Sequence, residues 1–214
     1  MIYSTLLFIH ITAGSASLLG AAGAIATKVF DTKHKWHILA GRVFFVGMVL
    51  VFLTTLPMTL LKPNLFLFLI GIFSFYLAFT GWRKAVNRSG KAGLPDKLAA
   101  ILMSITSIAM LGWGGWLSFV GLGDGNGITL IAFGAIGGLL ARKDIRQNRG
   151  KSLKGIARIR AHLISMMAAT IAATTAFLVV NLETDPIWIS WLLPTAIISP
   201  IIVWMSRKML PSRS

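Results

Sequence analysis

Seven blocks of the sequence almost completely lack charged side chains, and they constrain the fold more than any other feature. They cover residues 3–27, 37–61, 65–82, 98–120, 128–141, 161–181 and 187–205. A bilayer core about 30 Å thick needs about 20 mostly apolar residues for each helix that crosses it. Arg42 is the only Asp, Glu, Lys or Arg inside the blocks, and it lies close enough to an end to snorkel to the interface. The pattern predicts an all-α polytopic membrane protein, a seven-transmembrane-helix bundle with a short fifth segment.

The composition agrees with this class. Hydrophobic residues make up 56% of the chain and charged residues 13%, whereas a soluble protein carries about 25% charged residues. The longest polar stretch, Lys143–Ala157, is basic and contains glycines, and we expect it to be a loop. Because no segment is long and polar enough to form a soluble domain, we expect residues 1–214 to form a single integral membrane domain.

The cations fall on alternate connections between the blocks, which predicts the orientation. Twenty lie in the first, third and fifth connections and the C-terminal tail, with Arg42 counted in the first, and Lys62 alone lies on the other side. Positively charged connections stay in the cytoplasm, so we expect the N-terminus outside and the C-terminus cytoplasmic. The first block is read as a retained helix, because its first cation, Lys28, follows the apolar run, whereas a signal peptide carries its charge before it.

The formal net charge of +15 is therefore an asymmetry between two membrane faces. It predicts contact with anionic lipid at the inner face of the bilayer. Nucleic acid explains it poorly, because the cations are spread over four segments tethered to a membrane.

Several kinds of chemistry are excluded by missing residues. The chain has no cysteine, which removes disulfides, thiolate nucleophiles, Cys-ligated zinc and iron–sulfur clusters. It has no P-loop, Rossmann glycine pattern or kinase signature. With no carboxylate in any block, the usual proton relay of a transporter is missing too. Histidine is the residue type that remains.

His37 and His162 open two different blocks on the same predicted side of the membrane. Two imidazoles on facing helices can ligate haem b or copper, and Met166, one turn beyond His162, adds a soft ligand. His34 together with His37 suggests a zinc or copper site at the membrane surface. The alternative is that these are ordinary interfacial histidines.

His10 and Asn181 are further polar candidates within the blocks, at comparable predicted depth near the outer side. One interpretation is a small outward pocket between the first and sixth segments, with Glu183 or Asp185 at its mouth. The other is that His10 bonds a neighbouring helix and Asn181 caps its own.

Small residues recur every four positions in three segments, a spacing that lets helices approach closely in lipid. The ladders are Ala16–Gly20–Ala24, Ser165–Ala169–Ala173 and Gly134–Gly138. They suit packing within one bundle or a homo-oligomer face. Interfacial aromatic residues are expected at Trp113, Trp116, Trp188 and Trp191.

Three stretches of the chain combine glycines, aromatic residues and histidines in a distinctive pattern. The first contains His10, Gly14, Leu18–Gly20, Lys35, His37, Gly41–Arg42 and Gly47–Met48. The second runs from Asn64 to Trp82, and the third contains His162, Met166, Ala172, Thr175–Phe177, Val179–Asn181 and Trp191–Thr195. Together they resemble domain-of-unknown-function family 2306, predicted bacterial membrane proteins. The resemblance implies a multi-pass protein of a bacterial inner (cytoplasmic) membrane in which His10, His37 and His162 belong to the family pattern. It implies no reaction or substrate.

Two functions follow as hypotheses. The first is a histidine-ligated haem or metal site with a redox role. The alternative is a small-solute transporter or a non-enzymatic accessory subunit assembled with a membrane partner. A hydrolase would need a nucleophile beside a base, and Ser165 near His162 is the only obvious pair. Whether the protein is an enzyme stays open.

Overall fold

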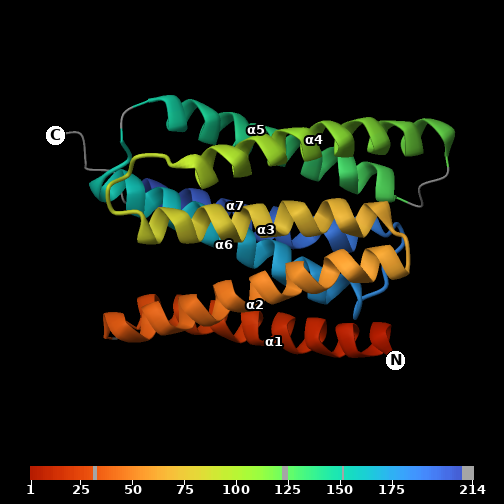
Figure 1. The fold of residues 1–214 in the computed structure, drawn as a ribbon, viewed down its shortest axis with the longest axis horizontal. Helices are drawn as coiled ribbons and strands as arrows, with labels where there is room; N and C mark the ends of the chain where they lie inside the picture. The colour runs from red at the N-terminus through yellow and green to blue at the C-terminus, as the bar shows by residue number, and fades with distance from the viewer. Residues whose placement is uncertain (31–32, 122–124, 151, 209–214) are drawn as a thin grey trace. The chain divides into compact units, whose positions relative to one another are not determined.

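The described part of the chain is entirely helical. The computed structural model describes residues 1–30, 33–121, 125–150 and 152–208. Within these residues it has seven helices and no strand (Figure 1). They are α1 (Ile2–Val29), α2 (His34–Leu61), α3 (Leu65–Val86), α4 (Leu94–Val120), α5 (Asn126–Arg149), α6 (Gly155–Val179) and α7 (Trp188–Lys208). The predicted all-α class is confirmed.

Six of these helices are long and apolar enough to cross a membrane: α1, α2, α3, α4, α6 and α7. Their length and composition support a multi-pass membrane protein. Helix α5 does not meet the same criterion, and a seventh crossing stays a prediction.

Helix α5 differs most from the expectation. Its predicted apolar segment, 128–141, is the first part of a longer helix that continues through the basic residues to Arg149. Arginine, lysine and glutamine favour helix, and the chain leaves the helix at Gly150, whose N–H bonds the Gln147 carbonyl at 3.2 Å. The predicted loop Lys143–Ala157 is therefore wrong for most of its length, since α6 begins at Gly155.

The helices form two compact units, Met1–Gly71 and Ile72–Ser214, which are described separately. The predicted single domain stays a prediction. In the first unit, α1 and α2 pack closely at glycines. A Cβ atom on Gly20 would lie 2.6 Å from the Phe44 nitrogen, and one on Gly47 would lie 2.7 Å from the Ala13 carbonyl oxygen. The buried stripe of α1 consists of Ala13, Ser17, Gly20 and Ala21, so it shares only Gly20 with the predicted ladder.

The second unit also relies on glycine contacts. A Cβ atom on Gly114 of α4 would lie 2.8 Å from the Gly127 carbonyl oxygen of α5, and one on Gly134 would lie 3.0 Å from the Met110 Cβ atom. These distances leave no room for a larger residue. Close backbone approach of this kind favours helix packing in lipid. Gly134 is the member of its predicted ladder that is buried.

Aromatic side chains from α3, α5 and α7 form part of the core of this unit. Phe73 stacks on Phe133 with ring centroids 5.2 Å apart, and Trp191 meets Phe133 edge-on at 6.4 Å. Trp191 is only 6% exposed. It is therefore a packing residue, whereas Trp113 and Trp116 are exposed and stack on each other at 4.9 Å, as suits a lipid-facing pair.

Candidate functional site

His10 lies on α1 and bonds α2 within the first unit. Its Nδ1 atom is 2.9 Å from the Thr54 hydroxyl oxygen. That hydroxyl has one proton, which it directs to the Leu50 or Val51 carbonyl at 2.8 and 2.9 Å. Nδ1 must therefore donate, and the lone pair of the neutral ring lies on Nε2. This agrees with the prediction that His10 bonds a neighbouring helix.

His37, on the first turn of α2, is oriented by α1. Its Nδ1 atom lies 3.0 Å from the Ala24 carbonyl oxygen. A carbonyl oxygen only accepts, so Nδ1 carries the proton and Nε2 carries the lone pair. The Thr27 hydroxyl donates to the same carbonyl at 2.8 Å, and the His34 ring stacks on the His37 ring at 6.1 Å. His37 is therefore oriented by contacts within the hairpin.

His162 has the same tautomer in the second unit. Its Nδ1 atom lies 2.9 Å from the Gly81 carbonyl oxygen of α3. Met166 contacts the same glycine, because a Cβ atom on Gly81 would lie 2.7 Å from the Met166 sulfur. The two predicted α6 ligands thus meet α3 at one residue that has no side chain. The Met166 sulfur packs on the α3 backbone.

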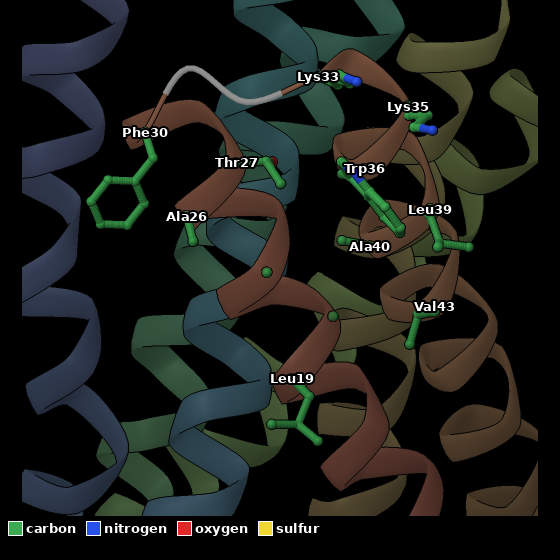
Figure 2. A pocket seen from close by; sticks show the side chains of 12 residues that line it. Leu19, Ala26, Thr27, Phe30, Lys33, Lys35, Trp36, Leu39, Ala40 and Val43 are labelled. Atoms are coloured by element: carbon green, nitrogen blue, oxygen red, sulfur yellow. The ribbon is translucent and has the colours of Figure 1, made fainter.

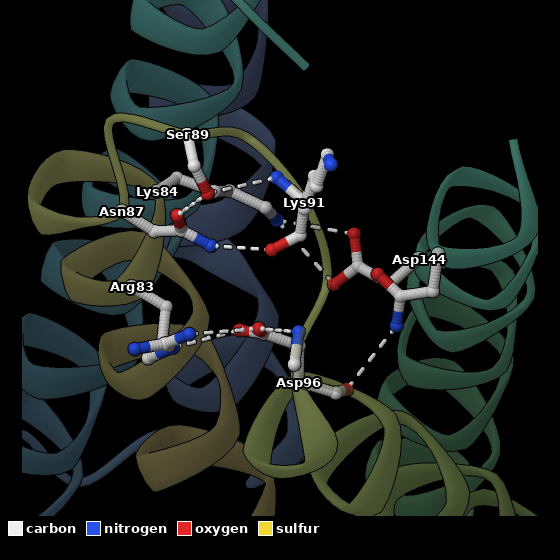
Figure 3. Close-up of polar contacts among 9 residues, drawn as sticks. Arg83, Lys84, Asn87, Ser89, Lys91, Asp96 and Asp144 are labelled. Atoms are coloured by element: carbon white, nitrogen blue, oxygen red, sulfur yellow. Dashed lines mark hydrogen bonds and ion pairs between the residues drawn. The ribbon is translucent and has the colours of Figure 1, made fainter. Parts of the chain in front are cut away.

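A cluster of charged and hydroxyl side chains joins α3, α5 and α6. The Lys84 ammonium lies 3.1 and 3.3 Å from the Asp144 carboxylate oxygens and 3.0 Å from the Ser165 hydroxyl. The Tyr76 hydroxyl donates to Asp144 Oδ2 at 2.7 Å, so this oxygen accepts from both Tyr76 and Lys84. Lys84 and Asp144 are 19% and 14% exposed. Figure 3 shows Lys84 reaching towards Asp144 across the gap between their helices.

A second ion pair closes the turn between α3 and α4. Arg83 binds both Asp96 carboxylate oxygens at 2.8 Å, as Figure 3 shows. Asp96 also accepts from the Gly93 N–H at 2.8 Å. An acid at this position caps α4, and its negative charge interacts favourably with the positive end of the helix dipole. Arg83 therefore fixes the start of the helix that follows it.

Arg158 caps the other helix end. Its NH1 atom donates to the Lys84 and Ala85 carbonyl oxygens, both at 2.7 Å. These carbonyls belong to the last turn of α3, where helix hydrogen bonds are left unmade and cations are favoured. Three cations expected only as orientation signals, Arg83, Lys84 and Arg158, thus have structural partners.

The partner of the Ser165 hydroxyl in this cluster is the ammonium of an ion pair, at 3.0 Å. The general base of a nucleophilic serine accepts the hydroxyl proton, whereas this arrangement supplies a donor. Ser165 is 8% exposed, which leaves little access for water. We assign the cluster to helix packing and orientation of α6, the helix that carries His162.

Asn181 bonds its own helix. Its amide donates to the Phe177 carbonyl oxygen at 2.7 Å, an interaction with the turn before it that agrees with the capping interpretation. Glu183 and Asp185 are exposed. The outward pocket with His10 stays a prediction.

A groove of about 1080 Å³ lies along α1 and α2 (Figure 2). Its walls are apolar, with Leu19, Trp36 and Leu39 among the lining residues, and Lys33 and Lys35 lie at one end. Trp36 lines the groove, but the following residue, His37, is not among its lining residues. The groove is a hollow in the apolar face formed by α1 and α2, and His37, the predicted haem or metal ligand, does not line it.

The described ranges contain no group of three or more His, Asp or Glu side chains arranged to hold a metal ion. The haem, copper and zinc ligands expected from the sequence stay predictions.

No family model, curated protein or solved structure matches this chain. The resemblance to domain-of-unknown-function family 2306 therefore stays a prediction that rests on the residues given above.

Proposed function

We propose that the chain crosses a bacterial cytoplasmic membrane seven times, with its N-terminus outside and its C-terminus in the cytoplasm. The support is the distribution of cations, twenty on one predicted side and Lys62 on the other. Two of the twenty, Lys151 and Arg213, lie outside the described residues. Helix α5 makes the short crossing with residues 128–141.

Within this membrane protein, we propose a b-type haem ligated by the Nε2 atoms of His37 and His162. One observation carries the proposal: each ring donates its Nδ1–H to a backbone carbonyl, at 3.0 and 2.9 Å. Histidines that ligate metals almost always use the second nitrogen in this way, which fixes the tautomer and raises the basicity of the ligating atom. The two rings lie in different units, and variants of each histidine test whether they share one iron.

The proposed role is electron transfer. If the two rings held one haem through their Nε2 atoms, that group would supply one-electron transfer. The reductant and the oxidant would each be membrane or surface electron carriers that exchange one electron with it. Met166 contributes by packing on Gly81, which holds the α6 turn that carries His162.

Absorption spectroscopy of the purified full-length protein tests this proposal. We expect a Soret band that shifts on reduction with dithionite, and stoichiometric iron by elemental analysis. His37→Ala and His162→Ala should each remove the band if one iron takes both ligands, and each should remove part of it if two irons are bound.

His34→Ala is the matched control, because His34 stacks on His37 but has no place in the haem proposal. It should keep the band. Loss of a zinc or copper signal in both His34→Ala and His37→Ala would instead support the surface metal site. A colourless protein without iron, copper or zinc after expression with added haem would overturn the redox proposal and favour transport or an accessory role.

A further inference from the structure

The basic end of α5 carries a groove that is separate from the histidines and from the charged cluster. It measures about 520 Å³ and is lined by Leu139, Arg142, Lys143, Arg146, Gln147 and Gly150. We propose that this groove binds the headgroup of an anionic phospholipid. The proposal rests on the membrane placement of the chain and is independent of haem.

The acid in this stretch, Asp144, faces away from the groove. Asp144 follows Lys143 directly, so a simple reading of the sequence would pair it with the neighbouring cations. Instead its carboxylate binds Lys84 and Tyr76 of α3, as Figure 3 shows for Lys84. Its charge is therefore engaged on the packed side of α5, away from the groove.

Three of the groove residues share one helix face. Leu139, Lys143 and Arg146 are separated by four and three residues, which places them on one side of a helix. Arg142, Lys143 and Arg146 are all exposed. In the part of the chain that the structure describes, the ion pairs of acids are with Arg83 and Lys84, and none involves these three cations. The groove thus keeps a net positive charge.

The apolar part of the groove identifies a lipid as the source of the phosphate. Leu139 is 66% exposed and lies one turn before the cations, so the site offers an apolar contact beside a phosphate-binding one. Guanidinium groups bind phosphate oxygens in pairs. A phospholipid can place its acyl chain against the leucine and its phosphate against the cations, whereas free phosphate makes no apolar contact.

The length of the apolar segment of α5 supports a position of Arg142 and Lys143 at the level of the lipid headgroups. Residues 128–141 rise about 21 Å as a helix, at about 1.5 Å per residue, which is shorter than the bilayer core of about 30 Å. A short segment is accommodated by local thinning and by snorkelling of flanking cations. Both bring headgroup phosphates to the level of Arg142 and Lys143.

Native mass spectrometry of the detergent-purified full chain tests the proposal, with phosphatidylglycerol as the anionic probe and phosphatidylcholine as the neutral one. We expect the wild type to retain phosphatidylglycerol in preference. The triple variant Arg142→Gln, Lys143→Gln, Arg146→Gln should bind it about a hundredfold more weakly, since each of the three cations near anionic lipid contributes about fivefold.

The control removes equal charge from exposed residues elsewhere in the same unit: Arg88→Gln, Lys91→Gln, Lys97→Gln. It should keep the preference, and an equal loss in both triple variants would overturn the site in favour of a diffuse charge effect. Arg146→Glu alone, with an unchanged circular dichroism spectrum, repeats the test with one substitution. Displacement of the lipid by excess inorganic phosphate, together with unchanged binding in Leu139→Ala, would overturn the lipid assignment and indicate a free-anion site.

Discussion

Lys84 of α3 and Asp144 of α5 form an ion pair at 3.1 Å, with less than a fifth of either side chain exposed. Tyr76 and Ser165 complete the hydrogen bonds of the pair. A pair with this much burial contributes mainly through what its loss would leave behind, an unpaired charge between packed helices.

Asp144→Asn should therefore destabilise the protein by about 2 kcal/mol, between the values typical of exposed and of fully buried pairs. Lys84→Met should cost less, because the carboxylate keeps the Tyr76 hydrogen bond. Thermal unfolding in detergent measures both losses of stability. The double variant Lys84→Met, Asp144→Asn should lose less stability than the sum of the two single losses. Additive losses would show that the pair has no coupling.

Gly20 and Gly41 provide a matched pair of glycine substitutions in the first unit. Gly20→Ala should cost about 1–3 kcal/mol, as overpacking does, because its Cβ atom would lie 2.6 Å from the Phe44 nitrogen and 2.9 Å from the Ala40 carbonyl oxygen. Gly41→Ala meets nothing within 4 Å and should be neutral, or stabilising by up to about 1 kcal/mol. The same unfolding assay compares them, and equal effects would contradict the packing described here.

The sequence predicts where the helices lie, apart from the end of α5, but it does not predict which residues make the contacts between them. Long uncharged blocks predict membrane helices because lipid leaves the backbone no other partners, and six of the seven expected spans have suitable helices. The end of α5 was missed because hydropathy falls at Ala141 while helix propensity does not. The ladder containing Gly20 was found, but only packing shows that Ala13 and Ser17 share its buried stripe.

The three histidines His10, His37 and His162 should each carry a proton on Nδ1. Each Nδ1 faces an oxygen that accepts: the Thr54 hydroxyl, the Ala24 carbonyl and the Gly81 carbonyl. Solid-state NMR of protein labelled with ¹⁵N-histidine distinguishes the two tautomers by their nitrogen shifts. Thr54→Val should shift only the His10 signals, and an Nε2–H tautomer at His37 or His162 would argue against haem ligation.

Arg158→Gln should loosen the end of α3. The substitution removes two charge-assisted hydrogen bonds, to the Lys84 and Ala85 carbonyl oxygens, each of which contributes about 1.5–3 kcal/mol at most. Hydrogen exchange should accelerate in the last turn of α3 and in the turn from Asn87 to Gly90, while α1 stays unchanged. Arg88→Gln, at an exposed position nearby, is the control and should leave exchange unaltered.

The absence of cysteine makes the orientation directly testable by single-cysteine labelling. In intact cells, a membrane-impermeant maleimide should modify Lys62→Cys and Asn126→Cys. Arg88→Cys and Arg149→Cys should react only after the membrane is permeabilised. Labelling of Asn126→Cys and Arg149→Cys from the same side would show that α5 does not cross.

The candidate site shows the same division between what sequence can and cannot predict. Histidine stood out because the apolar blocks hold almost no other titratable residue. The partners of these rings are backbone carbonyls of Ala24 and Gly81, which have no side-chain signature. The cluster around Asp144 was missed because its members are far apart in sequence. The available signal was one acid placed among cations just after an apolar segment.

Lys84 precedes Asp144 by 60 residues, and this order affects how the protein is made. When α3 leaves the ribosome, the partner of its lysine has not yet been synthesised, and Ser165 and Arg158 come later still. The polar contacts at the end of α3 can therefore form only after α5 and α6 have been synthesised. Formation of α3 and its final docking are separate events, and translation of the second half of the chain sets the interval between them.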